Sequence, residues 1–322
     1  MLFSTVAPAS TSTSTSRDAD SIPQHHPARD QFAPIPIPLR SLLPHSKLSL
    51  GCPILSRLLS GGLPVGTLTE ISGESATGKS QLCLQLLLSS LLPPCLGGLA
   101  ASSLLILPSL LPFSSLLKRL SRLPSPLHPS PLDHIFVASA HSPDHLMMLL
   151  YQADRLFHKS PSLMPPLRLI VVDSIAAIFR SEFDNNFGDL KARTGMFFRV
   201  AAKLKEQASR FGAVAVVTNQ VVDVMGPEMA GDVGNNHHMG PALLSSGRMV
   251  APAMGLSWAN CVNTRIFLSR NDEMAAVGVN GEDMAACTRR SMEVVFAPHV
   301  PRSSCEFVIR KDGVFGLDIE RQ

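Results

Sequence analysis

The sequence predicts an α/β fold with a mostly parallel central sheet covered by helices. Two kinds of segment alternate along the chain, namely short apolar runs and longer stretches in which apolar residues recur every three or four positions. Buried strands are expected at 104–107, 133–138, 167–172 and 213–218, and helices at 143–158 and 190–211. Such alternation indicates parallel strands, whose ligands bind at the carboxyl ends.

Length and composition place most of the chain in one core. The chain has 322 residues, of which 45% are hydrophobic, and this is enough to fill one large α/β core. Residues 1–46 instead contain a Ser-Thr repeat and the proline-rich run Ala33–Pro38. Such a segment cannot bury enough apolar surface to offset its ordering entropy. We therefore expect a disordered N-terminal extension over 1–46 and a core domain over 47–322.

Charge, cysteine spacing and hydropathy argue against a polyanion-coating protein, against disulfides or a zinc site, and against a membrane segment. The formal net charge is +3, which is too small for a protein that coats a polyanion. The six cysteines include no C-x-x-C pair, so they suit reduced thiols better than disulfides or a zinc site. Residues 80–117 carry no charge, but prolines and glycines interrupt them before about 20 apolar residues accumulate. No membrane partner is expected.

Residues 73–80 form a complete phosphate-binding motif of the type G-x-x-x-x-G-K-[ST]. Its members are Gly73, Glu74, Ser75, Ala76, Thr77, Gly78, Lys79 and Ser80. In such a loop, backbone amides converge on a polyphosphate at a helix N-terminus. Lys79 would reach the β- and γ-phosphates, and the Ser80 hydroxyl would ligate Mg²⁺. The alternative is an ordinary glycine-rich turn, which the strand at 66–71 and the helix at 81–88 disfavour.

Two later apolar runs end in polar residues. Asp173 closes the run 169–172, as expected of an aspartate that holds the water shell of Mg²⁺. The alternative is an aspartate that caps the following helix. The run 213–218 ends in Asn219 and Gln220, and an amide there can bind a γ-phosphate or orient a water. Lys79 and Gln220 are therefore the candidate catalytic residues.

Several short motifs, taken in order, resemble the RecA-like P-loop core of the eukaryotic recombination-repair paralogues. They are Leu48–Pro53, Gly61–Pro64, Leu68–Ile71, the phosphate loop with Gln81, Val172–Ser174, Thr218–Gln220 and Trp258–Asn260. The segments 179–184 and 297–307 look like the plant members. The resemblance covers residues 47–316. It rests on the order and spacing of the motifs rather than on any one of them.

The resemblance implies a role in homologous recombination in the nucleus, with ATP and Mg²⁺ as cofactors. It implies a heterodimer with another recombinase paralogue, which assists the strand-exchange recombinase on single-stranded or branched DNA. By position, the DNA-facing loops are 180–188 and 221–252. Arg180 and Arg248 are their candidate DNA contacts. Because 221–252 holds few basic residues, we expect weak and salt-sensitive DNA binding by the chain alone.

One departure from the family pattern bears on hydrolysis. In RecA-like ATPases, the strand after the phosphate-loop helix ends in a glutamate that polarises the attacking water. Between Glu74 and Asp133 this chain has no acidic residue, and the expected position falls on residues 108–111. None of these residues can accept a proton as a general base does. We therefore expect ATP binding with slow or absent hydrolysis.

Two other functions remain open at this point, and the basic residues of 189–211 and Trp258 each have two interpretations. An autonomous strand-exchange ATPase would need the missing carboxylate, and a P-loop small-molecule kinase would need an acceptor pocket and an arginine-bearing lid. The basic residues of 189–211 are expected to form the solvated face of an amphipathic helix rather than a DNA track. Trp258 is expected in the core rather than as a base-stacking platform.

Overall fold

The computed structural model describes residues 46–109, 131–158, 165–180, 187–224, 243–277 and 285–318. The chain divides into the units Met1–Leu43 and Pro44–Gln322, and all described residues lie in the second. The predicted extension, apart from Ser46, therefore lies outside the described residues. So do residues 181–186 and 225–242, which form most of the two predicted DNA-facing loops.

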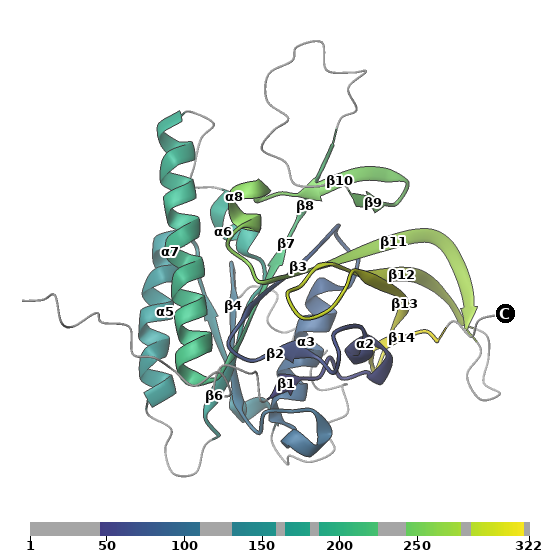
Figure 1. The fold of residues 1–322 in the computed structure, drawn as a ribbon, viewed down its shortest axis with the longest axis horizontal. Coiled ribbons are helices and arrows are strands. Elements are labelled where there is room, and N and C mark those ends of the chain that lie inside the picture. Colours follow the sequence, from purple (N-terminus) through teal and green to yellow (C-terminus); the bar gives the residue numbers. More distant parts are fainter. Residues whose placement is uncertain are drawn as a thin grey trace, which may run out of the picture. The chain divides into compact units, whose positions relative to one another are not determined.

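A central sheet with strand order β14-β13-β12-β11-β3-β7-β6-β4-β5 organises the described chain (Figure 1). Its strands are β3 (Leu68–Gly73), β4 (Ser102–Leu107), β5 (Ile135–Ser139), β6 (Leu167–Val172), β7 (Val214–Asn219), β11 (Thr264–Val277), β12 (Ala285–Phe296), β13 (Ser303–Arg310) and β14 (Gly313–Gly316). From β11 to β5 all neighbours are parallel, whereas β11 to β14 pair antiparallel. The predicted α/β class with a mostly parallel sheet is confirmed.

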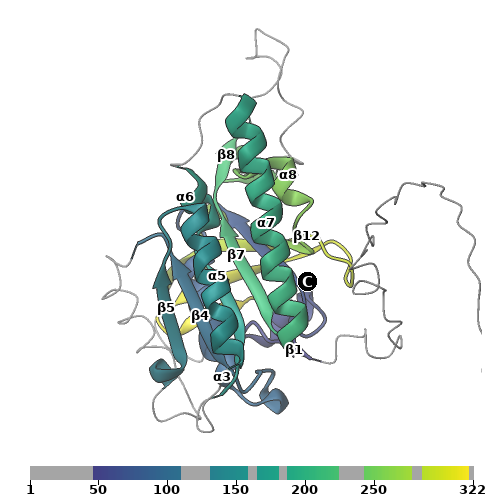
Figure 2. The same ribbon diagram turned by 90° about the vertical axis from the view of Figure 1, so that its left-hand side faces the viewer.

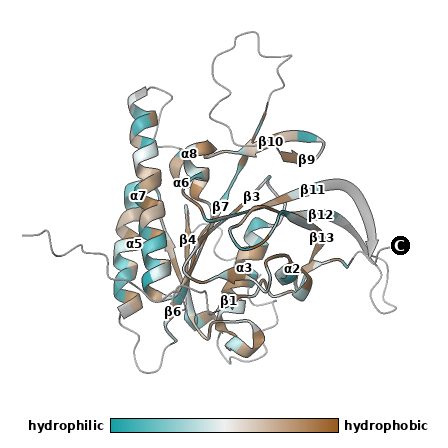
Figure 3. Ribbon diagram, viewed as in Figure 1, coloured by the Kyte–Doolittle hydropathy of each residue, from teal (hydrophilic) through white to brown (hydrophobic). Residues whose placement is uncertain are grey.

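Helices cover both faces of the parallel strands, which explains why these strands are apolar on both sides. Leu169 and Val171 of β6 pack into the cluster that includes α3 (Lys79–Leu91). Ile170 and Val172 face the opposite cluster, with α5 (Pro143–His158), α6 (Ile175–Arg180) and α7 (Phe187–Phe211). Figures 1 and 2 show α5 and α7 side by side on that face. Hydrophobic residues accordingly mark the strands and α3 (Figure 3).

The predicted elements in the described chain match the structure closely, with small shifts. Helix α5 has the predicted bounds, whereas α7 begins three residues earlier than 190. Residues 131–134 form the 3-10 helix η3, so β5 begins two residues later than predicted. Trp258 is fully buried, as expected, in α8 (Gly255–Ala259). The remaining short elements are α2 (Pro53–Leu58), η2 (Pro94–Leu96), β1 (Lys47–Leu48) and β2 (Leu63–Pro64).

One residue of the predicted solvated face of α7 is packed. Lys203 is 6% exposed, and its ammonium donates to Asp154 Oδ2 at 2.7 Å and to Glu206 Oε2 at 3.1 Å. Asp154 lies on α5, so the ion pair of Lys203 with Asp154 links α7 to α5. The expectation that all basic residues of α7 face solvent is therefore wrong for Lys203, because a carboxylate on α5 lies opposite it.

The ends of the predicted long loop 221–252 form a second sheet. Its strands are β8 (Val221–Asp223), β9 (Leu243–Ser245) and β10 (Arg248–Pro252), in the antiparallel order β8-β10-β9. The prediction of a loop is wrong for these segments. Strands of three to five residues are too short to show alternation in the sequence. Within the described residues, no helix is both long and apolar enough to span a membrane.

Candidate nucleotide-binding site

The phosphate-binding motif joins the end of β3 to the start of α3. Gly78 precedes the first helical residue with a φ of 108°, and Gly73 has a φ of 156°. A Cβ on Gly73 would lie 2.4 Å from the carbonyl oxygen of Leu268 in β11, and one on Gly78 would lie 2.7 Å from Ile309 Cδ1. The loop can thus follow this path only with glycine at both positions.

The side chain of Lys79, the first residue of α3, is buried against the phosphate loop that precedes it in the sequence. Its side chain is 7% exposed, and its ammonium donates to the carbonyl oxygens of Gly73 at 2.7 Å and Glu74 at 2.6 Å. Burial lowers the pKa of Lys79 below the ordinary value of 10.5, although the charges of Asp173 and Glu74 oppose this shift. The loop therefore holds a desolvated cation against neutral carbonyl groups.

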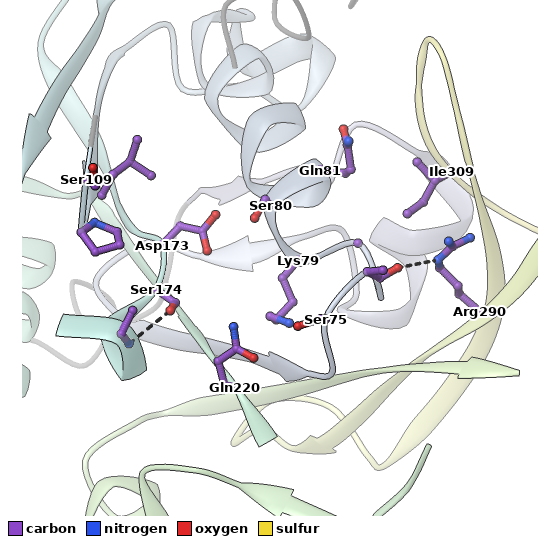
Figure 4. Close-up of a pocket in the computed structure, with 15 residues that line it drawn as sticks. Ser75, Lys79, Ser80, Gln81, Ser109, Asp173, Ser174, Gln220, Arg290 and Ile309 are labelled. Atoms are coloured by element: carbon purple, nitrogen blue, oxygen red, sulfur yellow. Dashed lines mark hydrogen bonds between the residues drawn. The ribbon is translucent and has the colours of Figure 1, made fainter. Parts of the chain in front are cut away.

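A cavity of about 820 Å³ adjoins the loop. It is lined by Ser75, Ala76, Gly78, Lys79, Ser80, Gln81, Leu107, Pro108, Ser109, Asp173, Ser174, Ala177, Gln220, Arg290 and Ile309. Lys79, Ser80, Asp173 and Gln220, which the sequence singles out, therefore all meet here (Figure 4). They meet because β3, β6 and β7 are parallel neighbours and end at the same edge of the sheet.

Asp173 follows β6, and its carboxylate lies on the cavity wall. Oδ1 accepts a hydrogen bond from Thr218 Oγ1 of β7 at 2.5 Å, and Figure 4 shows the side chain directed toward Ser80. The peptide bond between Asp173 and Ser174 is cis. Ser174 Oγ accepts from the backbone N–H of Ala177 at 3.3 Å, so Ser174 caps α6. The capping role considered for Asp173 therefore belongs to its neighbour.

The strand that carries a glutamate in RecA-like ATPases ends here without a carboxylate. After β4, the cavity wall is formed by Pro108 and Ser109. Among the described residues that line the cavity, Asp173 is the one acidic residue, and Thr218 already engages one of its oxygens. Gln220 also lines the described part of the wall, and its amide can orient a water by hydrogen bonding.

Two lining residues come from strands that the sequence reasoning did not connect with the loop. Arg290 of β12 donates from Nε to the carbonyl oxygen of Ala76 at 3.2 Å and from Nη1 to that of Thr288 at 2.9 Å. Ile309 of β13 packs beside Gly78. Both reach the site through sheet packing. No local motif marks them, since Arg290 lies 214 positions from Ala76.

The two candidate DNA contacts lie outside this cavity. Arg180 is exposed at the last position of α6. Arg248 begins β10 and is 57% exposed, but its guanidinium forms ion pairs with Glu74 and Asp223. A DNA phosphate would have to compete with two carboxylates for Arg248. Its role as a DNA contact stays a prediction, as does that of Arg180.

Comparison with known proteins agrees with this architecture. A model of the Rad51 protein family matches residues 45–247, which is more than half of the chain. The chain belongs to the Rad51 family. The resemblance inferred from the motif order is thereby confirmed, including its RecA-like core.

Within the Rad51 family, the chain is similar to several proteins named for DNA repair. It is 42% identical over 296 residues to the DNA repair protein XRCC3 homolog of Arabidopsis thaliana, covering 86% of this chain and 95% of that protein. It is 33% identical to DNA repair protein XRCC3 of Bos taurus, covering 85% and 75%. Identity to DNA repair protein RAD51 of Saccharomyces cerevisiae is 30%, covering 83% and 58%. The chain is thus a DNA-repair recombination paralogue.

Proposed function

We propose that this chain is an ATP-binding recombination-repair paralogue that acts in the nucleus, inside a complex with another recombinase paralogue. It supports the strand-exchange recombinase in homologous recombination and hydrolyses ATP slowly or not at all. The observation that carries the proposal is the meeting of Lys79, Ser80, Asp173 and Gln220 at one cavity, whose wall after β4 holds Pro108 and Ser109 and no glutamate in the described chain. The similarity to XRCC3 proteins supports the repair role.

The residues present fit Mg·ATP. Lys79 is a buried ammonium that contacts only backbone carbonyl oxygens by hydrogen bond in the described structure, and a phosphate oxygen is a stronger acceptor for it. The amides of residues 75–80 would hold the phosphates, as in other P-loops. Ser80 and Asp173 line the cavity and would supply oxygen ligands of the kind that Mg²⁺ prefers, Ser80 directly and Asp173 through water. Bound Mg²⁺ would neutralise charge on the phosphates.

Hydrolysis is expected to be slow because Asp173, the proposed Mg²⁺ ligand, is the one carboxylate in the described part of the cavity wall, which leaves no described side chain to act as a general base. A positioned base contributes typically about 10²–10⁴-fold to such a reaction. We expect steady-state ATPase activity, with single-stranded DNA present, to lie at least about 100-fold below that of a Rad51-family recombinase measured in parallel. The Lys79→Ala variant gives the background of the preparation. Turnover that depends on Lys79 and approaches the rate of the recombinase would contradict the proposal.

Complex membership can be tested by affinity purification from nuclear extract. We expect the tagged chain to recover another recombinase paralogue in near-equal amount, because the proposed complex is a heterodimer of two paralogues. As a control, purified chain alone is incubated with single-stranded DNA. Formation of regular filaments by the chain alone would favour the alternative of an autonomous strand-exchange ATPase.

The kinase alternative needs a test of its own. A small-molecule kinase needs a second pocket for the phosphate acceptor beside the phosphate loop. In the described chain, the cavity beside the loop is lined by Asp173, Gln220 and residues of β12 and β13, and we assign this space to the nucleotide. Under the proposed function, no phosphorylated small molecule is expected when the chain is incubated with ATP and cell metabolites, and the appearance of one would favour the kinase alternative.

A further inference from the structure

The hairpin formed by β9 and β10 reaches the phosphate loop with its tip. Ser245 pairs with Arg248 in the sheet register, and Ser246 and Gly247 between them have positive φ angles of 49° and 73°. Two consecutive residues with positive φ form the tight two-residue turn typical of β-hairpins. The hairpin tip, residues 245–248, is therefore a well-defined structure within the segment that the sequence predicts to be a loop.

Glu74, the second residue of the phosphate motif, is held by this hairpin tip. Its Oε2 accepts hydrogen bonds from Ser245 Oγ at 2.8 Å and Ser246 Oγ at 2.7 Å, and its Oε1 is ion-paired with Arg248. Glu74 is 9% exposed. Burial by itself raises the pKa of Glu74, but the two serine hydroxyls and Arg248 outweigh it and keep the pKa below its ordinary value. The carboxylate is thus charged and held on both oxygens.

Arg248 also binds the strand that leads away from the cavity. Its Nη1 donates to Asp223 Oδ1 at 3.0 Å and to Asp223 Oδ2 at 3.1 Å. Asp223 ends β8, which directly follows the cavity residue Gln220. The carbonyl oxygen of Gln220 accepts from the backbone N–H of Ala253, just after β10, at 2.8 Å. The phosphate loop, the hairpin and the strand after Gln220 therefore form one closed chain of contacts.

We propose that Arg248, with Ser245 and Ser246, is a positioning device for the phosphate loop, acting through Glu74. Arg248 is not among the residues that line the cavity, so its proposed effect on nucleotide is indirect. It fixes the peptide units at 73–75, whose carbonyl oxygens hold Lys79 before phosphate binds. This inference rests on the proposed ATP binding at the same cavity, and it gives Arg248 a role different from the DNA contact predicted from the sequence.

The contacts predict reciprocal coupling between nucleotide and hairpin. The ammonium of Lys79, which donates to the carbonyl oxygens of Gly73 and Glu74, would turn to a bound phosphate, and this would change the loop that Glu74 anchors. Any effect of the hairpin on nucleotide affinity must be matched by an equal effect of nucleotide on the hairpin. Nucleotide is therefore expected to protect the backbone amides of residues 243–252 from hydrogen exchange.

The test compares wild type with Glu74→Gln, Arg248→Met and the double variant. Affinity is measured by titrating a fluorescent ATP analogue at fixed Mg²⁺, and hydrogen exchange is followed over 243–252 with and without nucleotide. We expect each single variant to bind at least about fivefold more weakly, as is typical of coupled sites. The double variant should be no weaker than the weaker single variant, because both substitutions break the same pair. Nucleotide-dependent protection of 243–252 should be lost in all three.

Two further variants sharpen the result. Arg248→Lys keeps the charge but cannot bind two carboxylates with a planar fork, so its affinity should fall between those of wild type and Arg248→Met. Arg57→Met is the matched control, since Arg57 is an exposed arginine whose ion pair with Asp318 lies outside the cavity lining. It should bind nucleotide like wild type. Because Arg248 is largely exposed, its replacement should leave the fold intact.

The outcomes separate this inference from the proposed function. If wild type binds and Arg248→Met binds within twofold of it, the positioning role is wrong and ATP binding stands. If wild type itself does not bind, the proposed function is wrong. The positioning role is then judged by hydrogen exchange of residues 73–80 in the free protein. Faster exchange in Arg248→Met than in Arg57→Met would support it, and equal exchange would overturn it.

Discussion

Replacing Lys79 by alanine is expected to abolish measurable Mg·ATP binding. In the proposed complex the ammonium donates to oxygens of two phosphates, and hydrogen bonds to charged groups contribute about 1.5–3 kcal/mol each. Loss of two such bonds weakens binding by roughly 10²–10⁴-fold, at 1.4 kcal/mol per tenfold. Isothermal titration calorimetry with Mg·ATP measures this loss directly. An affinity within tenfold of wild type would contradict the placement of the triphosphate beside Lys79.

The loss of binding should occur without loss of folding. The pKa of Lys79 is below its ordinary value in the folded chain, so its protonated form is less favourable there than in the unfolded chain. At neutral pH, which lies below the unfolded pKa, this charge therefore reduces stability, and alanine removes that penalty. The thermal midpoint of Lys79→Ala is expected to be equal to or above that of wild type in the absence of nucleotide.

Lys203 provides the matched control for a buried lysine. It is as buried as Lys79, and burial alone lowers its pKa, but hydrogen bonds and ion pairs with Asp154 and Glu206 raise the pKa above the ordinary value. Its protonated form therefore stabilises the fold at neutral pH, and this contribution is lost only as the pH rises through the raised pKa. Lys203→Ala should lower the thermal midpoint and leave nucleotide affinity unchanged. Lys79→Ala should therefore reduce nucleotide binding without reducing stability, and Lys203→Ala should reduce stability without reducing nucleotide binding.

The sequence was sufficient to identify the parts of the site that are encoded locally. The phosphate loop, Asp173 and Gln220 each lie at the end of a strand, and parallel strands bring such positions to one edge of the sheet. The segment 108–111, where the family pattern places a glutamate, begins directly after β4, as the sequence predicts. Strand ends and helix starts are therefore the features that sequence patterns predict well in this fold.

The contacts that hold the loop in place could not be predicted from the sequence. Ser245 lies 171 positions from Glu74, and Arg265 lies 195 positions from Glu70, so no local period links either pair. The residues of the hairpin tip look like part of a glycine-rich loop, because each strand beside them is only three to five residues long. Sheet register decides these contacts, and register is set by the packing of the complete core.

The second large effect is expected at a buried ion pair between β3 and β11. Glu70 and Arg265 lie directly opposite one another in the sheet register, are 0% and 1% exposed, and form an ion pair. Glu70 Oε1 also accepts from Asn219 Nδ2 at 2.7 Å, and the Arg265 guanidinium lies 5.4 Å from the centre of the Phe296 ring. Arg265→Met removes the cation and leaves the Glu70 carboxylate buried with one amide donor. Unfolding free energy should fall by about 3–5 kcal/mol in urea denaturation.

The double variant Glu70→Leu with Arg265→Met tests whether the effect comes from the uncompensated charge. Replacing both members of a buried ion pair with apolar residues of similar size is often neutral or stabilising. We therefore expect the double variant to regain most of the stability that Arg265→Met loses, even though Asn219 then lacks its acceptor. Asn219 directly precedes Gln220, so a stable double variant that binds Mg·ATP more weakly would show that the pair positions the end of β7. Equal losses of stability in the single and double variants would instead place the effect in the packing of Arg265 against Phe296.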